Sequence, residues 1–435
     1  GATRNNDYAY ALGKMANEEA AAIGCNMAFA PVCDIHYNWE NTEIVTRAFG
    51  NDPVRVAQMS KAYMDGLHTI PGFACTAKHF PGNGLDFRDA HLSNNVNTFS
   101  VEEWDKTYGM VYKTLIDGGL DAIMGGHIML PEYARAINPA LKDEDMMPAT
   151  LSPEIMTTLL RGKLGFNGMV VTDASHMVGM TDRMTRREML PASINAGCDM
   201  FLFFNDPDED FNTMLDAYKS GVITRILGLK AHLGLNKKAK EALVPAPEVL
   251  AGALGKEEYK EMHKAISRDC ITLVKYKDRD VLPITPERYK RIMIVHVKGA
   301  ESGMGMLMKA MGMGGGKNPA EMLKERLCEK GFDAFIYESP LDAMKKQIAA
   351  GEKPNINLYF AGKNAIDDFV SGMDLVITLC DVSSGRPSFG LSKGGGEIPW
   401  YVFELPVVVI GCGQPTMLAD VPQARTYINT YDAKP

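Results

Sequence analysis

The chain contains no closely spaced pair of cysteines. Its eight cysteines are scattered and none forms a C-x-x-C motif, which argues against a zinc knuckle and a thioredoxin-type redox site. Cys75, Cys380 and Cys412 lie within apolar runs, where cysteine usually acts as a small buried side chain. This usage is typical of a reducing compartment, so we expect a cytoplasmic protein.

The sequence also lacks a long apolar run and an excess of basic residues. No apolar stretch reaches the roughly 18 residues that a membrane-spanning helix needs. The formal net charge of −8 argues against nucleic acid or an anionic membrane as the main partner. The chain opens at Gly1 without an initiator methionine, so a removed leader, and with it a secreted or cell-wall location, stays open.

The first half of the chain alternates between short apolar runs and amphipathic segments. Continuous apolar runs are typical of buried parallel strands, and their alternation with helices predicts a parallel α/β sheet. The predicted strands are Ala28–Pro31, Ala74–Ala77, Ala122–Met124, Met169–Val171 and Met200–Phe204, and the predicted helices include Asp52–Leu67, Val101–Asp117, Pro153–Lys163 and Arg187–Ala196. Five strands leave two alternatives, an open sheet or a (β/α) barrel that lacks its first units.

A second α/β pattern follows a polar segment with several lysines and prolines. Its predicted strands are Ile292–Val297, Ala334–Tyr337, Leu375–Leu379 and Val407–Ile410, which indicate a three-layer αβα sandwich. We therefore predict a barrel domain over 1–235, a linker over 236–285 that carries one helix and one strand, and a sandwich domain over 286–435.

Polar side chains follow each predicted strand of the first half. They are Asp34 and His36, Lys78 and His79, His127, Asp173 with Ser175 and His176, and Asn205 with Asp206. Parallel sheets bind ligands at the carboxyl ends of their strands. One polar strand end is weak evidence because loops are polar anyway, but five on one face indicate a ligand site.

Asp173 has two interpretations from its position alone. It directly follows an apolar strand, where an aspartate often caps the next helix. A carboxylate at the mouth of a barrel is also suited to attack the anomeric carbon of a sugar and form a covalent glycosyl intermediate. Strand-end position does not decide between the two.

The segment that begins at Lys78 leaves a strand and enters a glycine-rich turn. Lys78 and His79 are adjacent, so in an extended strand they point to opposite faces and contact one ligand only if the strand ends there. Further on, Asp89 and His91 are two residues apart in a polar loop. This spacing suits a carboxylate that orients an imidazole, and the alternative is an ordinary solvated loop.

Several motifs together resemble glycoside hydrolase family 3. They are Lys78-His79-Phe80-Pro81-Gly82, Gly126-His127, Leu164-Gly165-Phe166-Asn167-Gly168, Val171-Thr172-Asp173 and Ala196-Gly197-Cys198-Asp199-Met200. The resemblance runs from about residue 10 to 235 and, more weakly, through the second domain. It implies a (β/α)8 TIM-type barrel whose first strands precede residue 1, followed by an αβα sandwich.

The resemblance also implies roles for individual residues. Asp173 would be the nucleophile, and the stretch from Lys78 to His91 is similar to the signature of the β-N-acetylglucosaminidase branch. There an Asp-His dyad on a mobile loop replaces the carboxylic acid catalyst, so His91 would be the acid/base and Asp89 its orienting partner. Asn83 and Ala90 depart from the usual residues of that signature. Contacts to the sugar would come from Arg47, Lys78, His79, His127, Asp34 and Met177.

The implied function is that of a retaining exo-β-N-acetylglucosaminidase on peptidoglycan- or chitin-derived glycosides, without a cofactor. The alternatives are a β-glucosidase or other family 3 specificity with Glu397 as acid/base, a phosphorylase, and a non-catalytic sugar-binding protein. A histidine acid/base suits a phosphorylase because it does not repel phosphate. Metal binding by His79, His91 and His127 is not expected, because no H-E-x-x-H or similar spacing is present.

Overall fold

The computed structural model describes residues 1–218, 223–239, 242–277, 280–298, 318–338, 340–353, 370–381 and 402–432. The chain divides into two compact units, Gly1–Asp269 and Cys270–Pro435. This division falls inside the segment 236–285 that the sequence analysis treats as a linker. Across the described ranges, every helix is too short or too polar to cross a bilayer.

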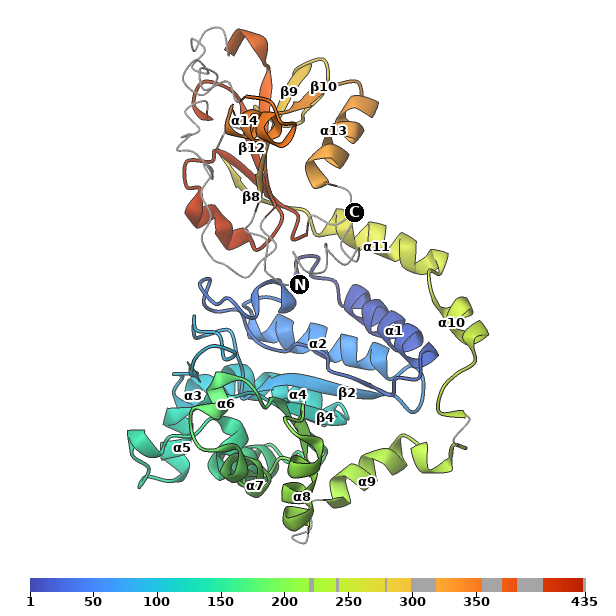
Figure 1. Cartoon of the computed structure of the whole chain (residues 1–435), viewed down its shortest axis with the longest axis vertical. Helices are drawn as coiled ribbons and strands as arrows, with labels where there is room; N and C mark the ends of the chain where they lie inside the picture. The colour runs from blue at the N-terminus through green and yellow to red at the C-terminus, as the bar shows by residue number, and fades with distance from the viewer. Residues whose placement is uncertain are drawn as a thin grey trace. The chain divides into compact units, whose positions relative to one another are not determined.

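The first unit is built on a parallel sheet of five strands, seen in Figure 1. The strands lie in the order β1 (Met27–Ala28), β2 (Ala74–Phe80), β4 (Ala122–Gly125), β6 (Met169–Ala174) and β7 (Met200–Leu202). All four pairings are parallel, so the carboxyl ends of the strands share one edge. The predicted fold class is confirmed: the sheet curls as half of a TIM-type barrel does.

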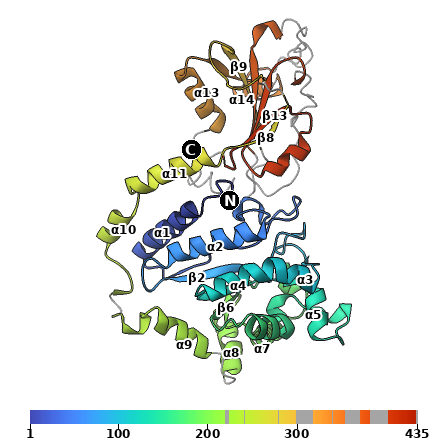
Figure 2. The ribbon, with the colours of Figure 1, turned by 180° about the vertical axis from the view of Figure 1, so that it is seen from behind.

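Helices cover the sheet, and α1 and α2 lie side by side in both views of the ribbon (Figures 1 and 2). The helices of this unit are α1 (Asn6–Ala22), α2 (Pro53–Leu67), α3 (Val101–Trp104), α4 (Met110–Asp117), α5 (Pro131–Ile137), α6 (Val178–Thr181), α7 (Arg186–Ala196), α8 (Pro207–Tyr218), α9 (Ile223–His232), α10 (Pro247–Ala253) and α11 (Glu257–Asp269). Two π-helical segments, Asp105–Gly109 and Glu154–Lys163, occupy parts of two predicted helices. A small parallel pair joins β3 (Asn95–Val96) to β5 (Ile128–Met129).

Alternation along the strands separates two apolar clusters. On β4, Ile123 belongs to the large cluster under the helices, whereas its neighbours Ala122 and Met124 belong to a second cluster on the opposite face. Successive side chains of a strand point to opposite faces, which explains this division. Met124 and Met169 are buried in the second cluster, so these methionines fill the core.

An aromatic cluster holds the carboxyl end of β2. Phe80 is fully buried, with its ring centroid 5.0 Å from that of Tyr112 and 6.1 Å from that of Trp104, both nearly edge to face. Burial of side chains of this size contributes about 1.5–3 kcal/mol each. Trp104 Nε1 donates to Pro81 O (2.8 Å) and Tyr108 Oη donates to Asn83 O (2.9 Å). These contacts from Trp104 and Tyr108 hold the turn after β2 in place.

Two of the family-like motifs have a structural role. Asp199 is fully buried, and its carboxylate pairs with Arg161 Nη2 (2.8 Å) and Arg225 Nε (2.7 Å) and accepts from Val170 N (2.8 Å). Arg161 also donates to the Gly168 carbonyl at the start of β6. These groups hold the amino ends of β6 and β7, far along the strands from Asp173.

The second unit contains a six-stranded sheet in the order β10-β9-β11-β12-β13-β8. Its strands are β8 (Thr272–Tyr276), β9 (Arg291–Lys298), β10 (Asp333–Ile336), β11 (Leu375–Asp381), β12 (Val407–Gly411) and β13 (Thr426–Asn429), and its helices are α13 (Pro319–Glu329) and α14 (Pro340–Ala349). Only β8 is antiparallel, which agrees with the mostly parallel sheet that was predicted. Glu397, the acid/base residue of the β-glucosidase alternative, lies outside the described residues.

Candidate active site

Asp34 and His79 are a buried pair at the carboxyl ends of the strands, where the polar side chains gather. Asp34 Oδ1 accepts hydrogen bonds from the backbone N–H of His79 (3.1 Å) and of Asn83 (2.7 Å), and Oδ2 lies 2.7 Å from His79 Nδ1. With Nδ1 as the donor to Asp34, the other ring nitrogen of a neutral His79 is an acceptor. His79 Nε2 lies 3.4 Å from Arg47 Nη2 and 3.9 Å from Asp173 Oδ2. Three of the residues predicted from the sequence, Asp34, Arg47 and Asp173, therefore lie beside His79.

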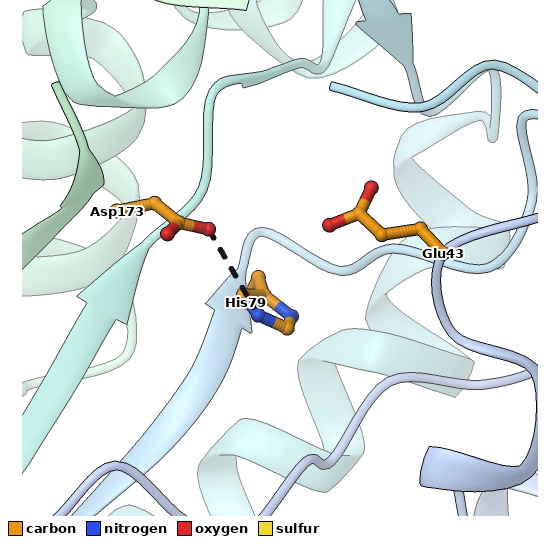
Figure 3. A group of neighbouring side chains, drawn as sticks. All are labelled: Glu43, His79 and Asp173. Carbon is orange, nitrogen blue, oxygen red and sulfur yellow. Dashed lines mark ion pairs between the residues drawn. The ribbon is translucent and has the colours of Figure 1, made fainter. Parts of the chain in front are cut away.

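Asp173 stands at the end of β6 and does not cap a helix. Its Oδ1 accepts from the N–H of Ala174 (2.7 Å), and the next helix, α6, begins five residues after Asp173 at Val178 without a side-chain cap. Its Oδ2 points toward His79, as Figure 3 shows. The alternative interpretation of Asp173 as a helix cap is therefore wrong, and its carboxylate is available to a ligand.

The loop that follows β2 carries the Asp89–His91 pair. Asp89 Oδ1 lies 2.7 Å from His91 Nδ1 and accepts from the His91 backbone N–H at 2.8 Å. The His91 side chain is 54% exposed, so its outer nitrogen is open to solvent and ligand. The loop docks on the start of α6, where Gly179 N donates to Ala90 O (3.0 Å). The carboxylate sets the tautomer of the imidazole, as its spacing predicted.

Glu43 is the site residue that the sequence analysis missed. It lies in the segment between β1 and α2, where Asn41 Oδ1 accepts from the N–H of Glu43 and shapes the turn. One oxygen of its buried carboxylate, one of Asp173 and a ring nitrogen of His79 lie within 4.8 Å of one another (Figure 3). Glu43 follows no strand, so the rule that pointed to the other residues could not find it.

Glu43 also lies close to the loop that carries Asp89 and His91. One of its oxygens lies within 4.8 Å of an oxygen of Asp89 and a ring nitrogen of His91. Glu43 therefore borders both the Asp173 side and the His91 side. Burial raises the pKa of Glu43, the electrostatic interaction with His79 and the hydrogen bond from Asn83 lower it, and the nearby carboxylates raise it further.

Lys78 and Arg47 add positive charge to the same place. Arg47 is exposed, and its Nη1 donates to the Glu43 carbonyl (3.1 Å). Burial lowers the pKa of Lys78 and the Arg47 charge lowers it further, whereas the carboxylates of Asp173, Asp34 and Glu43 raise it. The charges of Asp173, Asp34 and Glu43 therefore act on Lys78 as well as lying around His79.

His127 and Met177 are buried beside the site. His127 is 1% exposed, and its Nε2 lies 3.0 Å from Ala174 O while Nδ1 lies 2.8 Å from Thr150 Oγ1. Burial lowers the pKa of His127, so the ring is neutral, donating from Nε2 and accepting at Nδ1. Met177 is 3% exposed and precedes α6. Both are placed to support the backbone around Asp173.

Two of the remaining polar strand-end residues, Ser175 and Asp206, make structural side-chain contacts. Ser175 Oγ donates to Phe203 O (2.9 Å), and Asp206 Oδ1 caps α8 by accepting from the N–H of Glu209 (2.9 Å). His36 is partly buried, which lowers its pKa. These residues follow strands without joining the cluster around His79.

The cluster suits polar groups of a substrate better than a cation. Glu43, His79 and Asp173 form one of two groups in the described chain whose ligand atoms come within 4.8 Å. The nitrogen of His79 that faces this group already lies 3.4 Å from the Arg47 guanidinium. A metal ion there would be placed against a fixed positive charge, which disfavours it.

The comparisons with known proteins agree with this geometry. Residues 1–228 match the model of the glycosyl hydrolase family 3 N-terminal domain. The chain belongs to glycoside hydrolase family 3. Over its full length it is 37% identical to a β-N-acetylglucosaminidase/β-glucosidase of Cellulomonas fimi, of which it covers 74%. A β-hexosaminidase of Tolumonas auensis is 35% identical over 201 residues, 46% of this chain and 56% of that protein.

Solved structures of family 3 proteins have the same fold. The β-glucoside phosphorylase BglX is 34% identical with a TM-score of 0.84, and the match covers all of this chain and 74% of that one. A family 3 β-N-acetylglucosaminidase from Paenibacillus sp. FPU-7 has a TM-score of 0.74 at 23% identity and supports the fold alone. The chain is therefore a family 3 glycosidase.

Proposed function

We propose that this family 3 member is a retaining exo-β-N-acetylglucosaminidase, with Asp173 as nucleophile and His91 as general acid/base. The observation that carries the proposal is the position of Glu43, which lies within 4.8 Å of both the Asp173 group and the Asp89–His91 group. A nucleophile and a proton donor thus face one small space. The Cellulomonas fimi relative, whose name includes β-N-acetylglucosaminidase, supports the choice of sugar.

In the first step Asp173 attacks the anomeric carbon while His91 gives its proton to the departing oxygen. This produces a glycosyl ester on Asp173 and a neutral His91. In the second step His91 takes a proton from water, which attacks the ester and restores the β configuration. Asp89 holds the imidazole so that the same outer nitrogen serves both steps.

Recognition of the sugar rests on charge around His79. Arg47 and Lys78 supply donors to its hydroxyl groups, and the buried Asp34 fixes the His79 ring against them. We assign the terminal GlcNAc of peptidoglycan- or chitin-derived glycosides as the substrate. The exposed His91 loop suits a varied leaving group on the solvent side.

The test is the Asp173→Ala variant on an aryl β-GlcNAc. Turnover should fall by on the order of 10⁴-fold or more, because a covalent step cannot form without the carboxylate. Added azide should restore turnover and give an α-configured glycosyl azide, since it enters from the vacated face. Asp206→Ala, which removes a helix-capping aspartate after the neighbouring strand, is the matched control. Full activity of Asp173→Ala sinks the proposal.

Phosphorolysis of a β-glycoside is the second candidate. Its support is the 34% identity to β-glucoside phosphorylase BglX together with a histidine in the acid/base position. Phosphate is a dianion at neutral pH, and an imidazole does not repel it as a carboxylate would. Turnover that rises with phosphate and yields a glycosyl phosphate would favour this candidate, and aryl β-Glc beside aryl β-GlcNAc ranks the two sugars.

A further inference from the structure

Glu43 has no role in the two steps above, yet it lies at the centre of the site. Its side chain is 9% exposed, and it comes from a segment that carries neither the nucleophile nor the acid/base. In Figure 3 its carboxylate points toward the space above His79, across from Asp173. A buried carboxylate is costly unless its oxygens receive hydrogen bonds.

Only one of the two carboxylate oxygens of Glu43 has donors among the described residues. Oε2 accepts from Asn83 Nδ2 at 2.9 Å and from the Ala90 N–H at 3.4 Å. Neither contact involves Oε1, and within the described chain Oε1 is not among the enclosed atoms that lack a partner. The second oxygen is therefore held in place by the first and left open toward the site.

Distance restricts what can occupy that position. The nearest oxygens of Glu43 and Asp173 lie within 4.8 Å of each other. A hydrogen bond of about 2.8 Å takes up only part of this gap, so a single donor group fits there with its hydrogen directed at Glu43. When Asp173 faces the anomeric carbon, the groups next to that carbon are the ring oxygen, which has no hydrogen to donate, and the substituent at C2, which has one. A hydrogen bond at C2 strengthens as charge develops at the anomeric carbon.

We infer that Glu43 binds the substituent at C2 of the sugar, accepting a hydrogen bond from the N–H of a 2-acetamido group or from a 2-hydroxyl group. This inference rests on the proposed function for the orientation of the sugar. It makes Glu43 a specificity-determining residue, since a sugar without a donor at C2 leaves its buried oxygen unpaired. Glycosides that lack a donor at C2 are therefore the poorer substrates.

A coupling experiment tests the inference with Glu43→Ala and three aryl β-glycosides, of GlcNAc, of glucose and of 2-deoxyglucose. The variant should lose about 10- to 100-fold in kcat/KM on the first two, as expected for one hydrogen bond to a charged group. On the 2-deoxy substrate its loss should stay within about threefold, because the partner group is already absent. Equal losses on all three substrates overturn the inference, since a merely structural Glu43 acts on every substrate alike. No loss on any substrate also overturns it.

Two further measurements separate this inference from folding and from the proposed reaction. Glu43→Gln keeps the shape of the side chain, and Glu40→Ala removes an exposed carboxylate three residues earlier, which should change no substrate's kcat/KM. Calorimetric binding of free GlcNAc and of 2-deoxyglucose to the wild type and to Glu43→Ala measures the same coupling, between Glu43 and the C2 substituent, without turnover. The four affinities form a double-mutant cycle. Inactive wild-type protein would therefore contradict the proposed function, whereas an additive binding cycle would contradict only the role of Glu43.

Discussion

Asp34 gives the clearest case at the scale of a single residue. The Asp34→Asn variant replaces an acceptor by an N–H₂ group that faces either the ring N–H of His79 or the backbone donors. We expect kcat/KM to fall about 10- to 100-fold, because one buried donor is left unpaired and the His79 tautomer is no longer fixed. Steady-state kinetics checks this, with Asp206→Asn as control. Unchanged kinetics would show that His79 is held by other contacts.

The Asp89–His91 pair predicts a dependence on the leaving group. Asp89→Asn should lower kcat by on the order of 10²-fold on an aryl glycoside with a poor leaving group, because the imidazole loses its orientation. On a dinitrophenyl glycoside, which departs without a proton, the first step should be nearly unaffected. The two substrates are compared by pre-steady-state kinetics. A loss of equal size on both would contradict an acid role for His91.

Glu43 predicts a dependence of stability on pH. Burial raises its pKa in the folded chain, so the folded state binds the proton more tightly than the unfolded state. That contribution is complete below the unfolded pKa and is lost as the pH rises through the raised one. Glu43→Gln cannot ionise, so its thermal midpoint relative to wild type should be higher at pH 7 than at pH 4. Glu40→Gln serves as control, and a gain confined to low pH would reverse the sign.

Among the site residues predicted from the sequence, one group follows strands, whereas Asp89 and His91 were found from their spacing in a loop. Asp34, His79 and Asp173 were found because parallel strands end at one edge, a rule that needs only the order of apolar runs. Glu43 reaches them through a turn shaped by Asn41 and through the side chain of Asn83. Such a contact depends on how two loops fold against each other, which no spacing in the sequence encodes.

At the scale of elements, the turn after β2 depends on the helix segment beneath it. Tyr108→Phe removes the donor to the Asn83 carbonyl and should destabilise the first unit by about 1–3 kcal/mol. Asn83 also holds Glu43, so KM should rise along with the loss of stability. Denaturant unfolding and kinetics measure the two effects. Tyr10→Phe, on the exposed face of α1, is the control and should change neither.

Two glycines explain why this turn can pass so close to its neighbours. Gly82 has φ +123°, and a Cβ there would lie 2.1 Å from the Tyr108 ring, while Gly84 has φ +100° and a Cβ there would lie 2.2 Å from Ile35 O. The sequence indicated a tight turn from these glycines. Short elements were harder: β13 (Thr426–Asn429) was not predicted, because four residues that mix polar and apolar side chains give no clear apolar run.

At the scale of the whole molecule, each unit has its own apolar core. Trp104 and Ile123 belong to the core of the first unit, whereas Leu375 and Ile377 belong to a core of the second. The sequence predicted both sheets from apolar runs, but it placed a linker over 236–285, part of which contributes α10 and α11 to the first unit and β8 to the second. Apolar runs in the sequence reveal the helices and strands, but only the packing shows to which core each of them belongs.

Separate cores predict two unfolding transitions in calorimetry. Trp104→Ala should lower the first unit's transition, by about 3–5 kcal/mol, and Leu375→Ala the second unit's, by about 2–5 kcal/mol. Loss of activity on heating identifies the transition of the unit that carries Asp173. A single transition that moves with both variants would contradict this prediction.

The three hydrogen bonds of Asp34 have a consequence for how well the site keeps its dimensions. One carboxylate serves as the common reference point for the His79 backbone, the His79 ring and the backbone of Asn83. The amide of Asn83 in turn carries Glu43. A displacement of β2 would therefore move His79 and, through Asn83, Glu43 together. The relative position of these two side chains is thus set by a few short hydrogen bonds, each of which tolerates only a small change in length.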